Sequence, residues 1–555
     1  MSTPLANVSL DDKYTLTSGR IYLSGVQALV RLPVIQRLRD AAVGLNTAGF
    51  ICGYRGSPLG GFDQALWKAK KHLDKHHIKF QPGTNEEMAA TAVWGTQQVD
   101  LIGPSKYDGV FGMWYGKGPG VDRCGDVFKH GNHAGTSKHG GVLLVAADDH
   151  AAYSSTLPHQ SDHLFAASMI PVLYPSNVQE YLELGLHGWA MSRFSGCFVG
   201  FKALADTVES SASIDANPFA LEIKLPQDFV MPEGGLNARL STESLGLQAR
   251  AQEVLMQDYK IYAALAYSRT NRLNHVTIDS PRARLGIIGV GKSYLDVLTS
   301  LSELGIDQAT AEEIGIRVFK VAMPWPLEPE SVREFSRGLE EILVVEEKRQ
   351  MVEYQLKEQL YNWRDDVRPR VIGKFDEQGE WVAQRGKWLL TSKGDFSIAQ
   401  ISRVIAGRIA RFHVSDRIKA RLAFLEAKEA VLGNKAVLTP PRPPFYCSGC
   451  PHNTSTKVPE GSIALAGIGC HVMATAIYPD QNKTTTQMGG EGAIWIGQAP
   501  FSELNHVFAN LGDGTYFHSG SLAIRAAVAA NVNITYKILY NDAVAMTAAN
   551  PWTAR

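Results

Sequence analysis

Short apolar runs alternate with helix-like segments along most of the chain. Residues 41–58 predict a helix, a strand and a Gly/Pro turn, and residues 84–103 predict a capped helix with an acidic first turn. Residues 107–116 and 139–150 are strand-like, and the second of these runs ends in two acids. Strands that alternate with helices in this way favour a parallel α/β sheet.

The same alternation returns twice further along the chain. A helical spacer at 247–269 leads into a second α/β region that begins at residue 282. The proline-rich segment 439–453 introduces a third, because PPRPP can be neither a helix interior nor a central strand. We therefore expect doubly wound parallel sheets in three successive α/β domains, at residues 20–235, 280–385 and 440–555.

Composition excludes several classes of protein. The chain has 555 residues with 55 basic and 55 acidic side chains, and a net charge of zero argues against a nucleic-acid partner. No apolar run reaches the ~18 residues that cross a bilayer, and the N-terminus lacks the pattern of a secretory signal. Six scattered cysteines indicate a reducing compartment, which predicts a cytoplasmic protein without disulfides or a membrane anchor.

A Gly-Asp-Gly motif near the C-terminus carries the clearest chemistry. Asp513 follows an apolar run, and Asn541 follows a second apolar run 28 residues later. This spacing predicts that both lie at the carboxyl ends of parallel strands, where their oxygens suit Mg²⁺ and a diphosphate. Gly512 and Gly514 allow close approach of a phosphate, and a helix that begins near Ser519 favours an anion. The alternative is an ordinary Asp-Gly turn.

This motif resembles the diphosphate site of thiamine-diphosphate enzymes, whose domains are transketolase-like. Such enzymes use a glutamate that bonds the aminopyrimidine ring and activates the cofactor. Glu86 matches that glutamate, because Ala89, Ala92 and Gly95 follow it at the spacing of the family pattern, and it fits better than Glu87. The alternative is a solvated acid in the first turn of a helix.

Further motifs resemble the 2-oxoacid:ferredoxin oxidoreductases, and most closely the long, fused form of indolepyruvate ferredoxin oxidoreductase. They occur along nearly the whole chain, at residues 53–58, 147–150, 154–155, 160–162, 447–453 and 467–471. The resemblance implies a pyrimidine-binding domain, a transketolase-C-like domain and a diphosphate-binding domain, in that order.

The resemblance also implies an activity and its site. The reaction would be oxidative decarboxylation of a 2-oxo acid, such as indolepyruvate or another aryl pyruvate, to an acyl-CoA. Electrons would pass through iron–sulfur centres to ferredoxin, in a homodimer of the full-length form. Ser57 would face the substrate carboxylate, with Arg55 in the same turn as a further catalytic residue. Asp513, Asn541 and Ala543 would hold Mg²⁺.

Three cysteines are candidates for electron transfer. Cys447 and Cys450 form a Cys-x2-Cys pair, and Cys470 follows 20 residues later. A [4Fe–4S] cluster needs four thiolates, and in the family the fourth lies further downstream. The alternatives are Zn²⁺, with His452 or His471 as a further ligand, and no metal.

Two departures from the family pattern put turnover in doubt. The downstream catalytic domain of the family is missing, and the tail after Thr547 lacks the expected glycine-rich continuation. We expect a chain that is truncated in its last domain. The alternatives for function are a non-oxidative thiamine-diphosphate decarboxylase or carboligase and an inactive fragment of the oxidoreductase.

Two smaller features complete the analysis. Residues 286–293 satisfy the P-loop expression G-x4-G-K-S, but Ile287, Ile288 and Val290 are β-branched, so this segment predicts a strand and not a phosphate loop. His150, His159 and His163 lie near the implied active site, and the sequence does not decide which of them handles protons.

Overall fold

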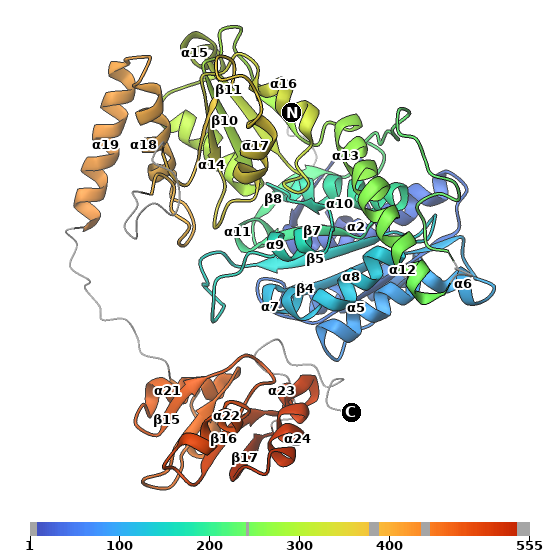
Figure 1. The fold of residues 1–555 in the computed structure, drawn as a ribbon, viewed down its shortest axis with the longest axis vertical. Helices are drawn as coiled ribbons and strands as arrows, with labels where there is room; N and C mark the ends of the chain where they lie inside the picture. The colour runs from blue at the N-terminus through green and yellow to red at the C-terminus, as the bar shows by residue number, and fades with distance from the viewer. Residues whose placement is uncertain (1–7, 240–243, 377–387, 434–444, 541–555) are drawn as a thin grey trace. The chain divides into compact units, whose positions relative to one another are not determined.

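The computed structural model describes residues 8–239, 244–376, 388–433 and 445–540 (Figure 1). The chain forms two compact units, Met1–Gly433 and Asn434–Arg555. The described part of the first unit contains two sheets that are wholly or largely parallel, and that of the second contains one parallel sheet. The three successive parallel or largely parallel sheets agree with the fold class that the sequence predicts.

The first sheet has six parallel strands in the order β3-β2-β4-β5-β7-β6. These strands are β2 (Thr47–Gly53), β3 (Ile78–Phe80), β4 (Gly109–Lys117), β5 (Val142–Asp148), β6 (Val172–Leu173) and β7 (Val199–Leu204). Every residue of β5 is buried, because helices cover both faces of the sheet. A two-stranded antiparallel ribbon of β1 (Arg20–Ser24) and β8 (Ser211–Asp215) lies beside it.

The helices of this region pack in two groups. Helices α2 and α10 contact each other and build one apolar core, whereas α5 and α8 contact each other and build a second (Figure 1). The helices are α1 (Asp12–Thr15), α2 (Gly25–Ala42), α3 (Phe62–Lys68), α4 (Lys70–Lys75), α5 (Glu86–Gly95), α6 (Val99–Ile102), α7 (Gly118–Arg123), α8 (Gly125–Ala134), α9 (Asp162–Ala167), α10 (Val178–Ser195) and α11 (Ala205–Val208). The expected helical spacer follows as α12 (Leu245–Val254), a π-helical segment Leu255–Lys260 and α13 (Ile261–Thr270).

The second sheet has five strands in the order β13-β12-β10-β11-β9, of which only β9 is antiparallel to its neighbour. The strands are β9 (His275–Ile278), β10 (Leu285–Val290), β11 (Ile316–Val321), β12 (Glu341–Val345) and β13 (Arg370–Ile372). Helices α14 (Lys292–Glu303), α15 (Gln308–Ile314), α16 (Pro329–Ser336), α17 (Val352–Leu360), α18 (Ile398–Ile409) and α19 (Asp416–Gly433) accompany it. Residues 286–290 of the P-loop expression thus lie on the buried strand β10, as predicted, and Lys292 and Ser293 already begin α14.

The third sheet has four parallel strands in the order β15-β14-β16-β17. They are β14 (Ala464–Ala466), β15 (Asn482–Thr485), β16 (Val507–Gly512) and β17 (Ile534–Leu539), with short helices α20 (His452–Ser455), α21 (Ala474–Ile477) and α22 (Ile494–Gln498). A continuous helical segment runs from α23 (Asp513–Thr515) through a π-helical turn into α24 (Ser521–Ala529). It begins at Asp513 and not near Ser519, because the strand ends at Gly512 and the helix follows at once.

Within each sheet, the connections of two neighbouring strands run in opposite directions. These pairs of strands are β2 and β4, β10 and β12, and β14 and β16. At such a point the connections leave the two strands in opposite directions, which opens a crevice at their carboxyl ends. The candidate functional residues of this chain gather at these three crevices.

The structure bears on membrane-spanning helices and on the state of the cysteines. Across the described residues, no helix combines the length and apolarity needed to cross a membrane. All six cysteines, which lie within the described residues, are free thiols in the structure.

A buried carboxylate joins the elements around the first sheet, and it makes a testable contribution to stability. Asp40 of α2 accepts hydrogen bonds from Arg193 of α10 at 2.7 and 2.9 Å, from Gln36 at 2.9 Å and from Thr47 of β2 at 2.7 Å. Asp40→Ala should lower the free energy of unfolding by about 3–5 kcal/mol, because it leaves the Arg193 charge without its partner.

Chemical denaturation followed by tryptophan fluorescence measures this change. The matched control is Asp74→Ala, which removes an exposed ion pair with Lys70 and should cost less than about 1 kcal/mol. Equal losses in the two variants would contradict a structural role for the Asp40 network.

Candidate active site

The predicted residues of the first region gather at the carboxyl edge of its sheet. Ser57 follows β2, Glu86 follows β3, Lys117 ends β4 and the segment 148–150 follows β5. The order β3-β2-β4-β5 makes these four strands immediate neighbours. Residues that are up to 93 positions apart in the sequence, from Ser57 to His150, therefore share one end of the sheet, beside the crevice between β2 and β4.

Glu86 is the first residue of helix α5 and is buried. Asn85 caps the helix by accepting the Met88 N–H at 2.9 Å, and the Trp114 indole N–H donates to the Glu86 carbonyl at 2.9 Å. A Cβ at Gly120 would lie 2.6 Å from Cγ of Glu86, so only glycine leaves room for this side chain. Glu87 is partly exposed. Glu86 is therefore more buried than Glu87, which is the order expected if Glu86 contacts the cofactor.

Ser57 and Arg55 occupy one turn but face different surroundings. The Ser57 Oγ lies 2.6 Å from the Ser154 Oγ in the loop after β5. The Arg55 Nε lies 3.3 Å from Asp63 Oδ2, and both side chains are buried. The Tyr115 hydroxyl donates to the other oxygen of Asp63 at 2.6 Å. The charge of Arg55 is therefore balanced inside the protein.

The loop after β5 is organised by two adjacent aspartates. Asp148 accepts from the Ser161 N–H at 2.9 Å and from its hydroxyl at 2.6 Å. Asp149 accepts from the Tyr153 and Ser154 N–H groups at 3.0 and 2.9 Å and from the Ser155 hydroxyl at 2.7 Å. Burial would raise the pKa of Asp149, but these hydrogen bonds outweigh it and hold the pKa below its ordinary value.

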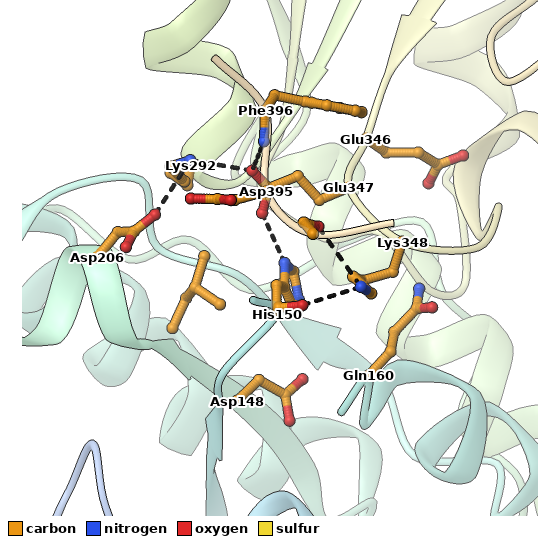
Figure 2. Close-up of polar contacts among 12 residues, drawn as sticks. Asp148, His150, Gln160, Asp206, Lys292, Glu346, Glu347, Lys348, Asp395 and Phe396 are labelled. Carbon is orange, nitrogen blue, oxygen red and sulfur yellow. Dashed lines mark hydrogen bonds and ion pairs between the residues drawn. The ribbon is translucent and has the colours of Figure 1, made fainter. Parts of the chain in front are cut away.

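The next residue, His150, joins the first sheet to the second (Figure 2). The His150 Nδ1 lies 2.6 Å from Glu347 Oε2, and Lys292 Nζ donates to Glu347 Oε1 at 2.9 Å. The Phe396 N–H completes the shell of Glu347 at 3.1 Å, and the Lys348 ammonium donates to the His150 carbonyl at 2.9 Å. Glu347 follows β12 and Lys292 follows β10, so this ion pair fills the crevice of the second sheet.

In this network, the opposite charges around Glu347 and Lys292 together outweigh burial in shifting the pKa of each residue. Burial alone would raise the pKa of Glu347, but His150 and Lys292 together hold it well below its ordinary value. Burial lowers the pKa of Lys292, yet the carboxylates of Glu347, Asp296 and Asp206 raise it above its ordinary value. Burial raises the pKa of Asp296 to about 6. Glu347 and Lys292 are therefore a stable ion pair at neutral pH.

The structure distinguishes the three candidate histidines. His150 is buried in the network with Glu347. His159 Nε2 lies 3.2 Å from an Asp122 carboxylate oxygen, and this hydrogen bond raises the pKa of His159. Burial lowers the pKa of His163. The raised pKa of His159 favours a protonated ring on this residue near neutral pH.

The second unit places Asp513 at the end of β16 as the first residue of its helix. The Gly514 N–H donates to Asp513 Oδ1 at 2.8 Å, and Asp513 is buried. Gly512 pairs with Leu539 in the parallel ladder of β16 and β17, as the predicted placement of the two strand ends requires. Asn541 and Ala543, the other predicted Mg²⁺ ligands, lie outside the described residues.

Glu491 organises the crevice between β14 and β16. Its carboxylate accepts the Ile468 N–H at 3.0 Å and the Gly489 N–H at 2.8 Å, and burial raises its pKa. A Cβ at Gly467 would lie 2.0 Å from Cγ of Glu491, so the glycine is required there. His471 is buried near Gly512, and burial lowers its pKa to about 4. Its Nε2 has no hydrogen-bond partner within the described residues, which leaves a polar atom available at this crevice.

The three candidate cysteines lie near one another. The Cys450 N–H donates to the Cys447 carbonyl at 3.0 Å, and Gly449 adopts a φ of +73°, which closes a tight turn. Cys447 and Cys450 act with burial to raise the pKa of the Cys470 thiol. Over the residues that the structure describes, no group of three or more His, Cys, Asp or Glu side chains is arranged to hold a metal ion. The cluster, zinc and metal-free alternatives all remain predictions.

Sequence reasoning missed three residues of these crevices. Glu347 stands in the run Glu346-Glu347 after an apolar segment, and nothing in that run indicates a partner for it. Glu491 stands between glycines in Gly489-Gly490-Glu491-Gly492, a pattern that indicates a carboxylate enclosed by backbone. Lys117 opens the segment Lys117-Gly118-Pro119-Gly120, in which a strand ends on a charge.

Comparison with a solved structure identifies the class of fold. The chain is similar to a 2-oxoglutarate:ferredoxin oxidoreductase from Magnetococcus marinus, with a TM-score of 0.50 and 15% identity over 71% of this chain and 66% of that one. That structure has 2-oxoglutarate, coenzyme A and succinyl-CoA bound. The fold is therefore similar to that of this 2-oxoacid:ferredoxin oxidoreductase, and the predicted α/β fold class of doubly wound parallel sheets is confirmed.

Sequence comparisons show which proteins of this class the chain resembles. Residues 274–435 match the family model of the indolepyruvate ferredoxin oxidoreductase middle domain. The chain is 24% identical to indolepyruvate oxidoreductase subunit IorA of Methanothermobacter marburgensis over 98% of this chain and 79% of that protein. It is also 24% identical to IorA of Pyrococcus abyssi, over 96% and 76%. The predicted resemblance to indolepyruvate ferredoxin oxidoreductase is thus confirmed.

The network around Glu347 predicts a pH-dependent stability. Glu347→Gln should lower the free energy of unfolding by about 3–5 kcal/mol at pH 7, because His150 and Lys292 lose a buried partner. The pKa of Glu347 is lower in the folded protein than its ordinary value of 4.5. Its stabilisation is therefore complete above pH 4.5 and is lost as the pH falls below that value.

Thermal unfolding of both proteins across pH 3–8 measures this effect. The midpoints should differ most at neutral pH and converge in acid. The control is Glu340→Gln, which removes an exposed pair with Arg284 and should change the midpoint little. A difference between wild type and Glu347→Gln that is constant with pH would contradict the assignment.

Proposed function

We propose that the chain takes part in the thiamine-diphosphate-dependent oxidative decarboxylation of a 2-oxo acid. An aryl pyruvate such as indolepyruvate is the proposed substrate, and the products are CO₂, an acyl-CoA and two electrons that pass through iron–sulfur centres to ferredoxin. The relatives are named as a subunit, so we infer that the chain works with a second subunit. The proposed domains for this reaction are a pyrimidine-binding domain at residues 20–235, a transketolase-C-like domain at 280–385 and a diphosphate-binding domain at 440–555.

One observation carries the proposal. Similarity to the IorA subunit of Methanothermobacter marburgensis extends over 98% of the chain, and it includes Glu86 in the first unit and Asp513 in the second, which lie at the carboxyl ends of their sheets. Fold similarity alone would not select a reaction.

The residues present fit that cofactor. Glu86 would bond the aminopyrimidine ring, while Asp513, Gly512 and Gly514 would hold the Mg²⁺-diphosphate end together with Asn541 and Ala543. When bound, thiamine diphosphate supplies a carbon nucleophile that adds to the 2-oxo group and stabilises the charge left by CO₂. Glu86 holds the proton at the ring nitrogen, and its burial excludes water from that bond.

The electron path is the least complete part of the proposal. Cys447, Cys450 and Cys470 would supply three thiolates to a [4Fe–4S] cluster, and a fourth ligand is still needed. Ser57 would contact the substrate carboxylate, and Arg55 would support the same turn through its ion pair with Asp63.

Binding of the cofactor should depend on Asp513. Thiamine diphosphate with Mg²⁺ at about 100 times its dissociation constant should stabilise the protein by about 2.7 kcal/mol, because the ligand binds only the folded state. Asp513→Ala should abolish the resulting rise in thermal midpoint. Asp480→Ala, at an exposed site in the same unit, is the control and should keep it. A folded wild-type protein whose midpoint does not move would contradict the proposal.

Turnover should depend on Glu86 and not on Glu87. With its second subunit, cofactors and CoA, the protein should reduce a viologen dye only when a 2-oxo acid is present. Glu86→Gln should slow this reduction about 10²–10⁴-fold, because an amide cannot hold the ring proton as a carboxyl group does. Glu87→Gln should stay near the wild-type rate. The reverse order of the two variants would move the role to Glu87.

A further inference from the structure

Lys117 stands at the crevice of the first sheet without an ionic partner. It is the last residue of β4, is half-buried, and its Nζ donates to the Ser154 carbonyl at 2.6 Å. Within the described residues, no carboxylate lies at ion-pair distance from it. Burial lowers the pKa of Lys117, and Asp149 opposes that effect. An ammonium group that is partly desolvated and unpaired is a costly arrangement unless an anion completes it.

Two other buried basic side chains at this edge are already paired with carboxylates. Arg55 pairs with Asp63, and Lys202 pairs with Asp148 and Asp162 at 3.4 and 2.6 Å. The fixed charges of both are therefore neutralised within the fold. Lys117 differs because its one hydrogen bond goes to a neutral backbone oxygen, which leaves two of its three N–H donors for another acceptor.

Two hydroxyl groups lie next to this lysine. A Cβ at Gly56 would lie 3.1 Å from Cβ of Lys117, which places the turn of Ser57 directly against it. The Ser57 and Ser154 hydroxyls are 2.6 Å apart, and one of them donates to the other. If Ser154 donates to Ser57, the Ser57 proton is left to donate outward. Asp149 fixes the Ser154 backbone through a 2.9 Å hydrogen bond, so the pair is held in place.

We propose that Lys117 is the cation that binds the substrate carboxylate, with the Ser57 hydroxyl as a second donor and Ser154 as the residue that positions it. One ammonium and one hydroxyl donor at a common point match the two oxygens of a carboxylate. Gly120, three residues after Lys117, packs on Glu86, so the same segment links this anion site to the proposed cofactor acid. The inference rests on the proposed function for the identity of its ligand.

The test is a binding titration of the full chain loaded with thiamine diphosphate and Mg²⁺. The probe is phenyllactate, a 2-hydroxy acid that keeps the carboxylate but cannot be decarboxylated as a 2-oxo acid. Lys117→Met and Lys117→Gln should weaken its binding about tenfold or more, as expected for loss of a charge-assisted hydrogen bond. Lys117→Arg should restore much of it. Binding of 3-phenylpropane-1,2-diol, which lacks the carboxylate, should be unchanged in all of these variants.

Lys138→Ala, at an exposed lysine in the turn before β5, is the matched control and should bind phenyllactate like wild type. Equal dissociation constants for wild type and folded Lys117→Gln would overturn the inference, and so would a wild-type protein that does not bind phenyllactate. Binding that depends on Lys117, in a protein that reduces no dye with any 2-oxo acid, would leave the carboxylate site standing and refute the proposed function.

Discussion

The reversal of strand order in each parallel sheet is the constraint on which this structure depends. Where two neighbouring strands send their connections in opposite directions, no connection covers the gap between their carboxyl ends. Each of the three sheets has such a pair of strands, and these pairs lie beside Ser57 and Lys117, beside Lys292 and Glu347, and beside Gly467 and Asp513. Because hydrogen bonding within each sheet fixes these positions, the fold sets where chemistry can occur before any side chain is chosen.

The three crevices are used differently. In the second sheet, Lys292 and Glu347 fill the gap with their own ion pair, and His150 extends that pair to the loop after β5 (Figure 2). The crevices of the first and third sheets instead hold an unpaired ammonium at Lys117 and an unpartnered imidazole nitrogen at His471, within the described residues. The crevice of the second sheet, whose charges are paired with each other, therefore has a structural role. The crevices of the first and third sheets are suited to ligands.

The sequence predicted the strands and helices well, because buried parallel strands are continuous apolar runs and their connections carry clear capping signals. It predicted β10 where a P-loop expression stood, since three β-branched residues cannot form a phosphate loop. It placed Glu86 in the first turn of a helix and Asp513 at the end of a strand, but it did not predict the partners of Glu347 or Glu491. Their environments depend on contacts such as His150 with Glu347, nearly 200 residues apart, and a single sequence contains no record of which distant segments meet.

The loop after β5 shows how the second sheet can influence the first without containing a proposed ligand site. Asp149 holds the backbone of Ser154, and Ser154 holds Ser57 and Lys117. His150, the residue after Asp149, is held by Glu347 and by Lys348 from the second sheet. The proposed carboxylate site is therefore positioned from both sheets of the first unit. A buried ion pair joins two domains at a higher cost in free energy than apolar contacts do. Unlike apolar packing, however, an ion pair is directional. It therefore fixes the orientation of one loop at the place where a substrate would be recognised.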